Sequence, residues 1–350
     1  MAPPTDSDRL GTFDGMRGLA ALLVALYHFQ QHRGIATIPG YLAVDLFFVL
    51  SGFVIAARYG PLLADGMTLA DFWRSRLVRL YPLYLAGLAL GIVAQASIAW
   101  RGEAGALSPA GGVAALGFGL VLLPDPFHKT LFPLNGTAWS LFFELLVNLV
   151  FATTLHRLGS RWLVAIAATA ALILAMTVHP PDCFNIGWDW KSFPGGLMRA
   201  TGAFAAGMLV FRWASTARRP ETTAAVLPLL AMAAPILLLP HRADWQLLVV
   251  VLLFPVLVAW AARVEPPARL RGAFLRAGDL SYAIYAINLP LLEAFRPLIR
   301  AVPAWLGGAM YLAVLVGLAH LLTRWFDGPV RATLDARRRG RPLAAAGNPA

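Results

Sequence analysis

The sequence contains one cysteine, Cys183, among 350 residues, and only 13% of its residues are charged. A single thiol excludes an internal disulfide and is too few for a thiolate metal cluster, so we expect no bound metal. A soluble domain carries about 25% charged residues, and the shortage here argues against a soluble fold. Hydrophobic residues make up 59% of the chain, and the mean hydropathy is +0.66, both typical of a membrane domain.

Acidic residues and lysines are also scarce. The chain has 18 Asp and Glu against 29 Lys and Arg, which gives a formal net charge of +11. A positive surplus often indicates nucleic-acid binding, but these basic residues stand in short loops between apolar runs and form no single solvated face. We therefore expect no nucleic-acid partner, and we take the lipid bilayer as the surroundings of the chain.

Ten apolar segments have roughly the length of a membrane-spanning helix. They lie at 15–32, 40–57, 80–98, 139–156, 162–178, 197–211, 223–239, 245–262, 278–295 and 305–325. We expect an all-α polytopic membrane protein in which about ten transmembrane helices form one bundle. Residues 1–14 are expected to be a cytoplasmic N-terminal segment without a signal peptide, 15–327 the transmembrane domain, and 328–350 a disordered cytoplasmic tail.

The distribution of positive charge predicts the orientation, because loops rich in Arg and Lys stay in the cytoplasm. With ten spans and a cytoplasmic N-terminus, 21 of the 29 basic residues lie inside and 8 outside. An eleventh span at 107–123, which is apolar but rich in glycine, leaves only 12 inside. We therefore expect a bacterial inner-membrane protein with both termini cytoplasmic, and 107–123 as part of an outer or re-entrant connection, 99–138.

The first segment carries two polar residues on one face. Arg17 and His28 are eleven residues apart, which is three helical turns and about 16 Å along the axis. Both are destabilising in a bilayer, so their shared stripe favours an interior site. Imidazole titrates near neutral pH and burial keeps it neutral, so His28 can act as a general base. The alternative is a histidine that only hydrogen-bonds between helices.

The second segment contains AVDLFFVLSGFVI, in which Asp45 lies at about the depth of His28. An ionised carboxylate in the bilayer needs a partner. Asp45 either orients the imidazole of His28, which is a catalytic role, or forms a salt bridge with an arginine. Nearer the cytoplasm, Ser51 and Gly52 indicate close helix packing.

Arginines gather where the third segment enters the membrane, in FWRSRLVRLYPLY. Arg76 and Arg79 are one turn apart, and the predicted topology places Arg17 on the same side. Guanidinium groups bind phosphate through paired hydrogen bonds, so the three arginines predict a clamp for a phosphorylated cytosolic donor. The alternative is topological, since arginines at the headgroup level also stop the transfer of a chain across the membrane.

The fourth segment begins with NGTAWSLFFELLVNLVF. Glu144 lies about five residues inside it, and Asn148 follows one turn later on the same face. An unpaired buried carboxylate is strongly destabilising, so Glu144 either pairs with Arg199 or binds acceptor hydroxyls. Asn148 and Trp139 are further candidate substrate contacts, although Trp139 also suits an interfacial anchor.

A second polar stripe crosses the ninth segment, SYAIYAINLPLL. Tyr282, Tyr285 and Asn288 recur there at intervals of three residues, and Glu293 lies near the outer end. Residues three apart share a helical face, so we assign Tyr282 and Asn288 to the candidate substrate site.

Together these landmarks resemble the acyltransferase-3 family of integral-membrane O-acyltransferases, which modify bacterial surface glycans and some secondary metabolites. The resemblance covers about residues 10–330 and rests on six motifs in order. They are Arg-x10-His at Arg17 and His28, VDLFFVLSGF at 44–53, Arg-x-x-Arg-Leu-x-Pro at Arg76, Arg79 and Pro82, WSL-x-x-E at Trp139–Glu144, SYxIY at 281–285, and F-[ED]-x-P at Phe326, Asp327 and Pro329.

The resemblance implies acyl transfer from cytosolic acyl-CoA, usually acetyl-CoA, to a hydroxyl of a carbohydrate acceptor presented from the far side. It implies that His28 is the catalytic histidine and that Arg17, Arg76 and Arg79 bind the donor. Many members carry a histidine where this chain has Asn288, which can hydrogen-bond but cannot move a proton at neutral pH.

The alternative function is a transporter or flippase of a lipid-linked sugar, which would use the same intramembrane charges along its path. Transporters often show inverted halves with paired broken helices, and the sequence shows no such symmetry. A homo-oligomer is compatible with either function.

Overall fold

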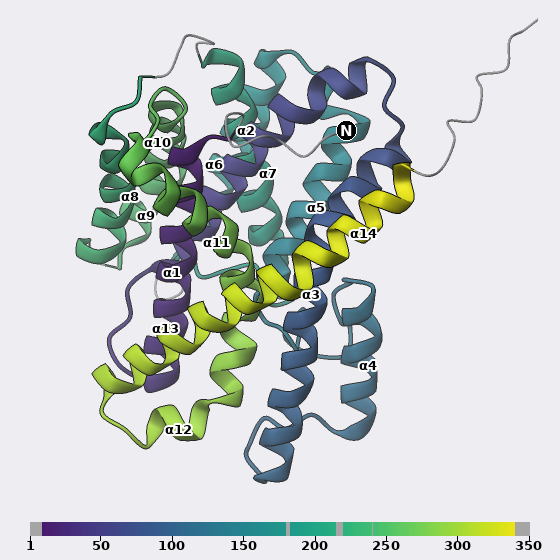
Figure 1. Ribbon diagram of the computed structural model, residues 1–350, viewed down its shortest axis with the longest axis vertical. Helices are drawn as coiled ribbons and strands as arrows, with labels where there is room; N and C mark the ends of the chain where they lie inside the picture. Colours follow the sequence, from purple (N-terminus) through teal and green to yellow (C-terminus); the bar gives the residue numbers. More distant parts are fainter. Residues whose placement is uncertain (1–8, 180–182, 215–219, 240, 340–350) are drawn as a thin grey trace, which may run out of the picture.

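The computed structural model describes residues 9–179, 183–214, 220–239 and 241–339 (Figure 1). Helices dominate this part of the chain and it contains no β-sheet, so the all-α prediction is confirmed. The helices are α1 (Gly11–Arg33), α2 (Ala43–Ala64), α3 (Leu69–Trp100), α4 (Pro109–Leu120), α5 (Ala138–Thr153), α6 (Ser160–Thr177), α7 (Phe193–Trp213), α8 (Leu227–Leu238), α9 (Ala243–Leu248), α10 (Phe254–Ala261), α11 (Ala268–Ala294), α12 (Arg296–Arg300), α13 (Ala304–Leu321) and α14 (Gly328–Arg339).

Each of the ten apolar segments falls on a helix, but five helical stretches are long and apolar enough to cross a membrane. These are Gly40–Ala64, Leu69–Trp100, Ser160–Thr177, Ala243–Ala261 and Ala304–Leu334. α1, α7 and α11 are long enough as well, and the charged residues that they carry lower their hydropathy. The count of about ten crossings therefore stays a prediction.

Two long helices continue past a proline by means of a looser turn. α9 and α10 join through a π-helical turn, Val249–Leu253, that ends just before Pro255. α13 and α14 join through a second such turn, Leu322–Asp327, that ends just before Pro329. Proline lacks the N–H that the preceding turn would bind, and its ring displaces a carbonyl there, so the wider turn lets the helix pass without breaking.

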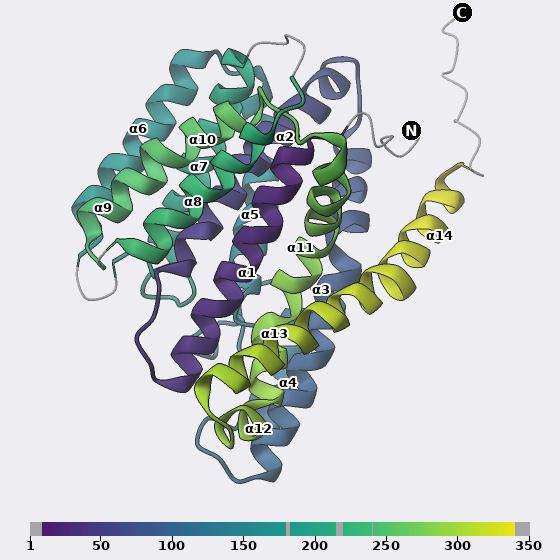
Figure 2. The same ribbon diagram turned by 60° about the vertical axis from the view of Figure 1, so that its left-hand side comes forward.

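α1 and α11 lie side by side through the middle of the bundle, and both views show them together (Figures 1 and 2). Gly18 allows this close approach, because a side chain there would overlap Ala277 of α11. α2 and α7 approach in the same way, since a side chain at Gly52 would meet the backbone of Phe204 and one at Gly207 the backbone of Val49. The packing role predicted for Gly52 is confirmed.

α4 is too short to cross a bilayer alone. Its 12 residues extend about 18 Å, against a hydrocarbon core of about 30 Å. The hydroxyl groups of Tyr81 and Tyr84 on α3 donate to the carbonyl oxygens of Leu120 and Gly119 at its end. Segment 107–123 is therefore attached to α3, and its place in an outer or re-entrant connection stays a prediction that rests on the charge distribution.

The disorder predicted for the tail is wrong for its first half. Gly328–Arg339 forms α14, because Pro329 suits the first turn of a helix and Ala, Leu and Arg have high helix propensity. α14 crosses the front of the bundle obliquely in Figure 1. The predicted disorder of 340–350 lies outside the described residues.

Candidate functional site

Two neighbouring polar pairs connect the later halves of α1 and α11, and Arg9, just before α1, pairs with Asp279 on α11. In Figure 1 both helices begin at the upper end of the bundle and run towards its lower end. Because they run in the same direction, residues about 260 positions apart face each other, as His28 and Asn288 do. Arg17 stands in the upper half of α1 and His28 in the lower half, about 16 Å further along the axis.

His28 is held by Asn288. His28 Nδ1 lies 2.6 Å from Asn288 Oδ1, and Asn288 Nδ2 donates to the carbonyl oxygen of Tyr285 at 2.6 Å. A carbonyl oxygen only accepts, so the second bond fixes the amide orientation and turns Oδ1 towards the ring. Since Oδ1 also only accepts, Nδ1 of His28 carries the hydrogen. Nε2 then keeps its lone pair, which is the form that a general base requires.

This contact gives Asn288 a definite task. Asn288 is fully buried, and His28 as a whole residue is half-buried. The hydroxyl of Tyr311 on α13 donates to the backbone carbonyl of Asn288 at 3.0 Å and secures that turn. Asn288 therefore orients the imidazole of His28 without moving a proton. A histidine at this position would be able to do both.

The predicted contact between Asp45 and His28 is wrong. Asp45 accepts two hydrogen bonds from Arg199 on α7, from Nε at 3.0 Å and from Nη2 at 2.6 Å, and both side chains are completely buried. The same guanidinium donates to the carbonyl oxygens of Ile186 at 2.7 Å and Tyr41 at 2.9 Å. The ion pair considered as the alternative thus forms, and it separates Asp45 from the candidate base.

Trp139 packs on the same ion pair. The Cζ atom of Arg199 lies 5.1 Å from the centre of a Trp139 ring, a cation–π distance, and Trp139 is only 8% exposed. The sequence assigned Trp139 to the substrate site. Its position against Arg199 instead favours a structural role inside the bundle.

Glu144 pairs with Arg76 and not with Arg199. Arg76 Nη2 donates to Glu144 Oε1 at 2.9 Å, and the hydroxyl of Ser51 donates to the same oxygen at 3.0 Å. These contacts join α2, α3 and α5. Arg76 is 4% exposed, so removing it would leave a partly buried carboxylate without its counter-charge.

Arg79 has three other arginines near enough for their charges to act on its own. Its guanidinium is repelled by the charges of Arg17, Arg76 and Arg331 and attracted by that of Glu144. Within the part of the chain that the structure describes, no carboxylate lies within ion-pairing distance of Arg79. The structure therefore brings the three predicted arginines together, and Arg79 keeps donors for an anion.

Arg331 on α14 is the member of this group that we did not predict. It pairs with Asp327, one turn earlier, at 2.7 Å, and its Nη2 donates to the backbone carbonyl of Arg79 at 2.8 Å. Asp327 belongs to the F-[ED]-x-P motif, so the motif holds the arginine that follows it by four residues. The four-residue spacing of Asp327 and Arg331 was the feature of the sequence from which this ion pair could have been predicted.

Pro82 explains why backbone carbonyls of α3 are free to accept hydrogen bonds from side chains of other helices. A proline inside a helix removes one backbone hydrogen bond and pushes the carbonyls of the preceding turn outwards. Those of Arg79 and Leu80 lie in that turn, and Leu80 accepts a hydrogen bond from the hydroxyl of Tyr282 at 2.6 Å. Tyr282, predicted to bind substrate, therefore joins α11 to α3 through its hydroxyl.

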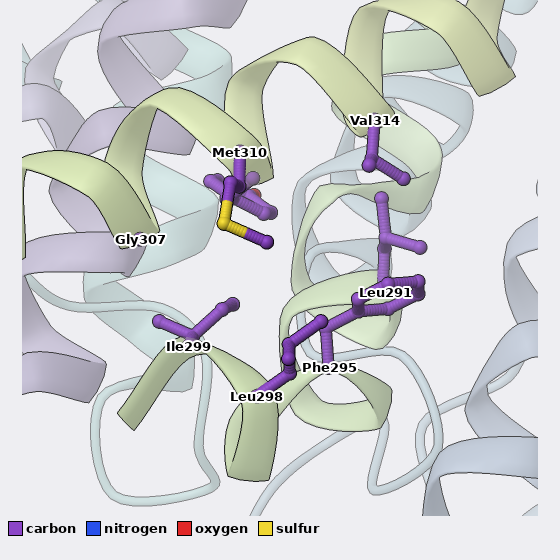
Figure 3. A pocket seen from close by; sticks show the side chains of 8 residues that line it. Leu291, Phe295, Leu298, Ile299, Gly307, Met310 and Val314 are labelled. Carbon is purple, nitrogen blue, oxygen red and sulfur yellow. The ribbon is translucent and has the colours of Figure 1, made fainter. Parts of the chain in front are cut away.

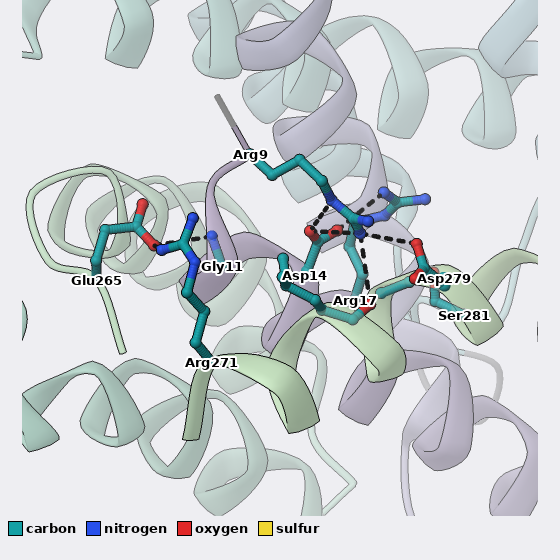
Figure 4. A network of polar contacts seen from close by, with 10 residues as sticks. Arg9, Gly11, Asp14, Arg17, Glu265, Arg271, Asp279 and Ser281 are labelled. Carbon is teal, nitrogen blue, oxygen red and sulfur yellow. Dashed lines mark hydrogen bonds and ion pairs between the residues drawn. The ribbon is translucent and has the colours of Figure 1, made fainter. Parts of the chain in front are cut away.

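Arg17 stands beside a polar network at the start of α1 (Figure 4). Asp14 accepts hydrogen bonds from Arg9 Nε at 3.0 Å and Nη2 at 2.8 Å, and Arg9 also pairs with Asp279 on α11 at 2.8 Å. Arg17 Nη1 is 3.6 Å from Asp14, a longer contact. Because Arg9 is the main partner of Asp14, Arg17 keeps donors that an anionic ligand can use.

Asn148 is completely buried on α5, and neither its Oδ1 nor its Nδ2 has a hydrogen-bond partner among the described residues. A buried amide without partners destabilises a fold, so we expect Asn148→Leu to raise the free energy of unfolding by about 1–3 kcal/mol. Thermal unfolding of the purified protein in lipid nanodiscs measures this. A lower melting temperature would show that the amide makes hydrogen bonds in the membrane, as its predicted substrate role requires.

The two described hollows lie away from these residues. A small apolar cavity of about 30 Å³ lies between α11, α12 and α13, where Leu291, Ile299 and Met310 point into it (Figure 3). A hollow of about 480 Å³ lies where α2, α5 and α7 end, with Arg157 and Arg212 on its wall. Neither is lined by His28 or Arg79, so the candidate site rests on the polar contacts described above and not on a cavity.

Comparison with known proteins identifies the family. The sequence model of the acyltransferase-3 family, described as an acyltransferase domain, matches residues 10–324. Protein 2 in picA locus of Rhizobium radiobacter is 40% identical over 187 residues, which are 49% of this chain and 95% of that protein. No solved structure matches the chain.

Two further relatives carry names that state an activity. The Acyltransferase MdmB of Streptomyces mycarofaciens is 33% identical over 156 residues, which cover 41% of this chain and 38% of that protein. The Putative peptidoglycan O-acetyltransferase YrhL of Bacillus subtilis (strain 168) is 40% identical over 73 residues, which cover 20% of this chain and 11% of that protein. The chain thus spans well under half of each of these two relatives.

Proposed function

Because the chain belongs to the acyltransferase-3 family and is an acyltransferase, we propose that it moves an acyl group from acyl-CoA to a hydroxyl of a carbohydrate or glycosylated acceptor. Acetyl-CoA is the simplest donor, since one relative is named as a putative O-acetyltransferase. The protein is a membrane protein with five helices long and apolar enough to cross a bilayer. We place it in a bacterial inner membrane with both termini cytoplasmic, because this orientation keeps most arginines inside.

The hydrogen bond between His28 and Asn288 carries the proposal. It leaves Nε2 of His28 unprotonated on a half-buried residue. Nε2 removes the proton of the acceptor hydroxyl while the oxygen attacks the thioester carbonyl. The new C–O bond forms, the C–S bond breaks, and His28 returns the proton to the thiolate. The products are the acyl ester and free CoA, and His28 is regenerated.

The arginine group provides the binding site for the phosphates of the acyl donor. Arg17, Arg76 and Arg79 converge with Arg331 at the end of the bundle that the topology places in the cytoplasm. Guanidinium groups bind the phosphates of CoA there, and the narrow pantetheine arm reaches the additional 16 Å or so towards His28. The nucleotide stays in water while the thioester meets the base inside the bilayer.

The direct test is release of free CoA thiol. Purified protein in lipid nanodiscs receives acetyl-CoA with and without a bacterial envelope glycan fraction as acceptor. Acceptor-dependent thiol release supports the proposal, together with a gain of acetyl mass on the glycan. A transporter would leave the thioester intact, and intact acetyl-CoA in the presence of acceptor would overturn the proposal.

Arg79→Ala is expected to raise the KM for acetyl-CoA by roughly tenfold to a hundredfold, since a hydrogen bond to a charged group is worth about 1.5–3 kcal/mol. Arg79 is the best arginine to test, because Arg76 is also the partner of Glu144. Arg74→Ala is the matched control, since Arg74 is exposed and lies on the same helix. An unchanged KM in Arg79→Ala would contradict the phosphate clamp.

A further inference from the structure

A second group of arginines gathers at the lower end of the bundle, opposite the donor arginines. It joins the end of α1, the end of α11, α12 and the turn that follows α3. We call it the lower basic cluster, and its residues are Arg33, Arg101, Arg296 and Arg300 with His32, Glu103 and Glu293.

The cluster is continuous. Arg296 Nη1 lies 3.3 Å from Glu103 Oε2 and 3.8 Å from Glu293 Oε2, so one guanidinium bridges two carboxylates. Glu103 also accepts from Arg101 at 2.6 Å, and Glu293 Oε1 lies 2.7 Å from Nε2 of His32. These bonds order the side chains from four separate segments.

Arg33 and Arg300 complete the cluster, and neither has a carboxylate partner among the described residues. Arg300 donates to the backbone carbonyl of His32 at 3.2 Å, and Arg33 donates to that of Ile299 at 2.9 Å. Neither contact neutralises a guanidinium charge. Arg300 is exposed, so the cluster is open to solvent at this edge.

Positive charge therefore exceeds negative charge. Four guanidinium groups face two carboxylates, and the charges of Arg296 and Arg300 act on both of these carboxylates. The hydrogen bond from Arg101 and these charges lower the pKa of Glu103, so that it stays ionised and two positive charges remain in excess. A folded network with this surplus attracts an anion.

Guanidinium nitrogens in the cluster are also left without acceptors. Arg33 Nε, Arg101 Nη2 and Arg296 Nε are buried and have no hydrogen-bond partner among the described residues. Each of these groups carries an N–H that a carboxylate or phosphate oxygen would satisfy. Arg58 Nε and Arg76 Nε are in the same state elsewhere in the bundle, but three such nitrogens from separate segments gather only in this cluster among the described residues.

The predicted topology makes the cluster unusual. It assigns 8 of the 29 basic residues to the outer side, and four of those eight are in this cluster. Arginines outside the membrane oppose the positive-inside preference, so a gathering of them indicates a local task.

The cluster adjoins the proposed base. His32 follows His28 by one turn on α1, and Glu293 follows Asn288 by five residues on α11, so the second pair stands directly below the first. The two histidines are close enough to interact electrostatically. A ligand held by the cluster is therefore within reach of Nε2 of His28.

We propose that the lower basic cluster binds an acidic group, a carboxylate or a phosphate, on the glycan that accepts the acyl group. This inference rests on the proposed function, because it names the class of acceptor: an acidic and not a neutral glycan. The anionic group docks on Arg296 and Arg300, and a neighbouring hydroxyl of the same glycan reaches His28.

Binding without acyl-CoA tests the cluster separately from catalysis. The full chain in phosphatidylcholine nanodiscs is titrated with trigalacturonic acid and its trimethyl ester, which differ in charge but share their ring hydroxyls. A second pair, phosphorylated maltotriose and maltotriose, tests phosphate. We expect at least tenfold tighter binding of the acidic member in one pair, and the preferred pair identifies the acid. Equal affinities in both pairs would overturn the proposal.

Variants test whether the preference for the acidic oligosaccharide depends on the lower basic cluster. Arg296→Gln with Arg300→Gln should lose the tenfold preference, whereas Arg296→Lys with Arg300→Lys should keep most of it. Arg242→Gln is the control, since Arg242 is exposed and pairs with Asp244 outside the cluster. Arg300→Gln alone, at an exposed position, should reduce the preference even if the double variant fails to fold.

Two outcomes would overturn the proposal further. One is an acid preference that survives in the folded glutamine variants. The other is its loss when phosphatidylglycerol replaces part of the lipid, since the cluster would then bind lipid headgroups. Because no acyl-CoA is present, a failure of thiol release elsewhere would reject the proposed function and leave this result standing.

Discussion

His28→Ala is expected to lower the turnover number for acyl transfer by a factor of about 10² to 10⁴, which is what a positioned general base contributes. The substitution removes the Nε2 lone pair that Asn288 leaves available. His28 is only half-buried and α1 makes its other contacts through neighbouring residues, so the protein should still fold. Thiol release at saturating acetyl-CoA and acceptor measures the loss.

Two further variants show whether the effect is specific. His320→Ala removes an exposed histidine from α13 and should keep full turnover. Asn288→Leu keeps His28 but removes the acceptor that fixes its tautomer, so turnover should fall less than in His28→Ala, with an unchanged KM for acetyl-CoA. Near-normal turnover in His28→Ala would mean that another group removes the proton.

Asp45→Asn is expected to reduce the free energy of unfolding by about 3–5 kcal/mol, because it leaves a buried guanidinium without its counter-charge. The pair between Asp45 and Arg199 is completely buried and doubly hydrogen-bonded. Thermal unfolding in nanodiscs measures the change. The fraction of the variant that remains folded should keep a normal turnover number, since Asp45 does not contact His28.

The chain supplies a matched control for this ion pair. Asp244 and Arg242 form a pair of similar length, 2.7 Å, but their side chains are 58% and 64% exposed. Solvent screens such a pair, so Asp244→Asn should leave the melting temperature almost unchanged. Equal losses of stability in the two variants would contradict the assignment of Asp45 to a structural ion pair.

The interior positions of the polar residues were predictable from the sequence. Charged and amide groups in apolar segments are too destabilising to face lipid, so His28, Asp45 and Glu144 had to point into the bundle. The spacing of Arg17 and His28 likewise placed the base three turns from an arginine. These inferences need only the geometry of one helix.

The choice of partners was not predictable in the same way. Asp45 and Arg199 are 154 positions apart, and the depth of Asp45 in the membrane fits a contact with His28 equally well. The structure settles the choice because glycines bring α2 against α7, so that Arg199 reaches Asp45. Which helices adjoin is a property of packing between segments, and a hydropathy pattern read along one segment does not contain it.

Arg331 shows the same limit of local patterns. Its arginine-rich surroundings after Gly328 suggested disorder, whereas the helix continues through a π-helical turn and brings Arg331 against α3. Composition alone does not reveal a contact of this range. The salt bridge from Asp327 one turn earlier was the local sign that the segment is ordered.

The hydrogen bond from Arg331 to the backbone carbonyl of Arg79 joins residues 252 positions apart. The ribosome therefore makes the two helices that it connects, α3 and α14, at very different times. α1 and α3 are made first, and α14 follows only after the segments between them. The contact that fixes α14 against α3 can therefore form only late in folding, after both of these distant segments have been made.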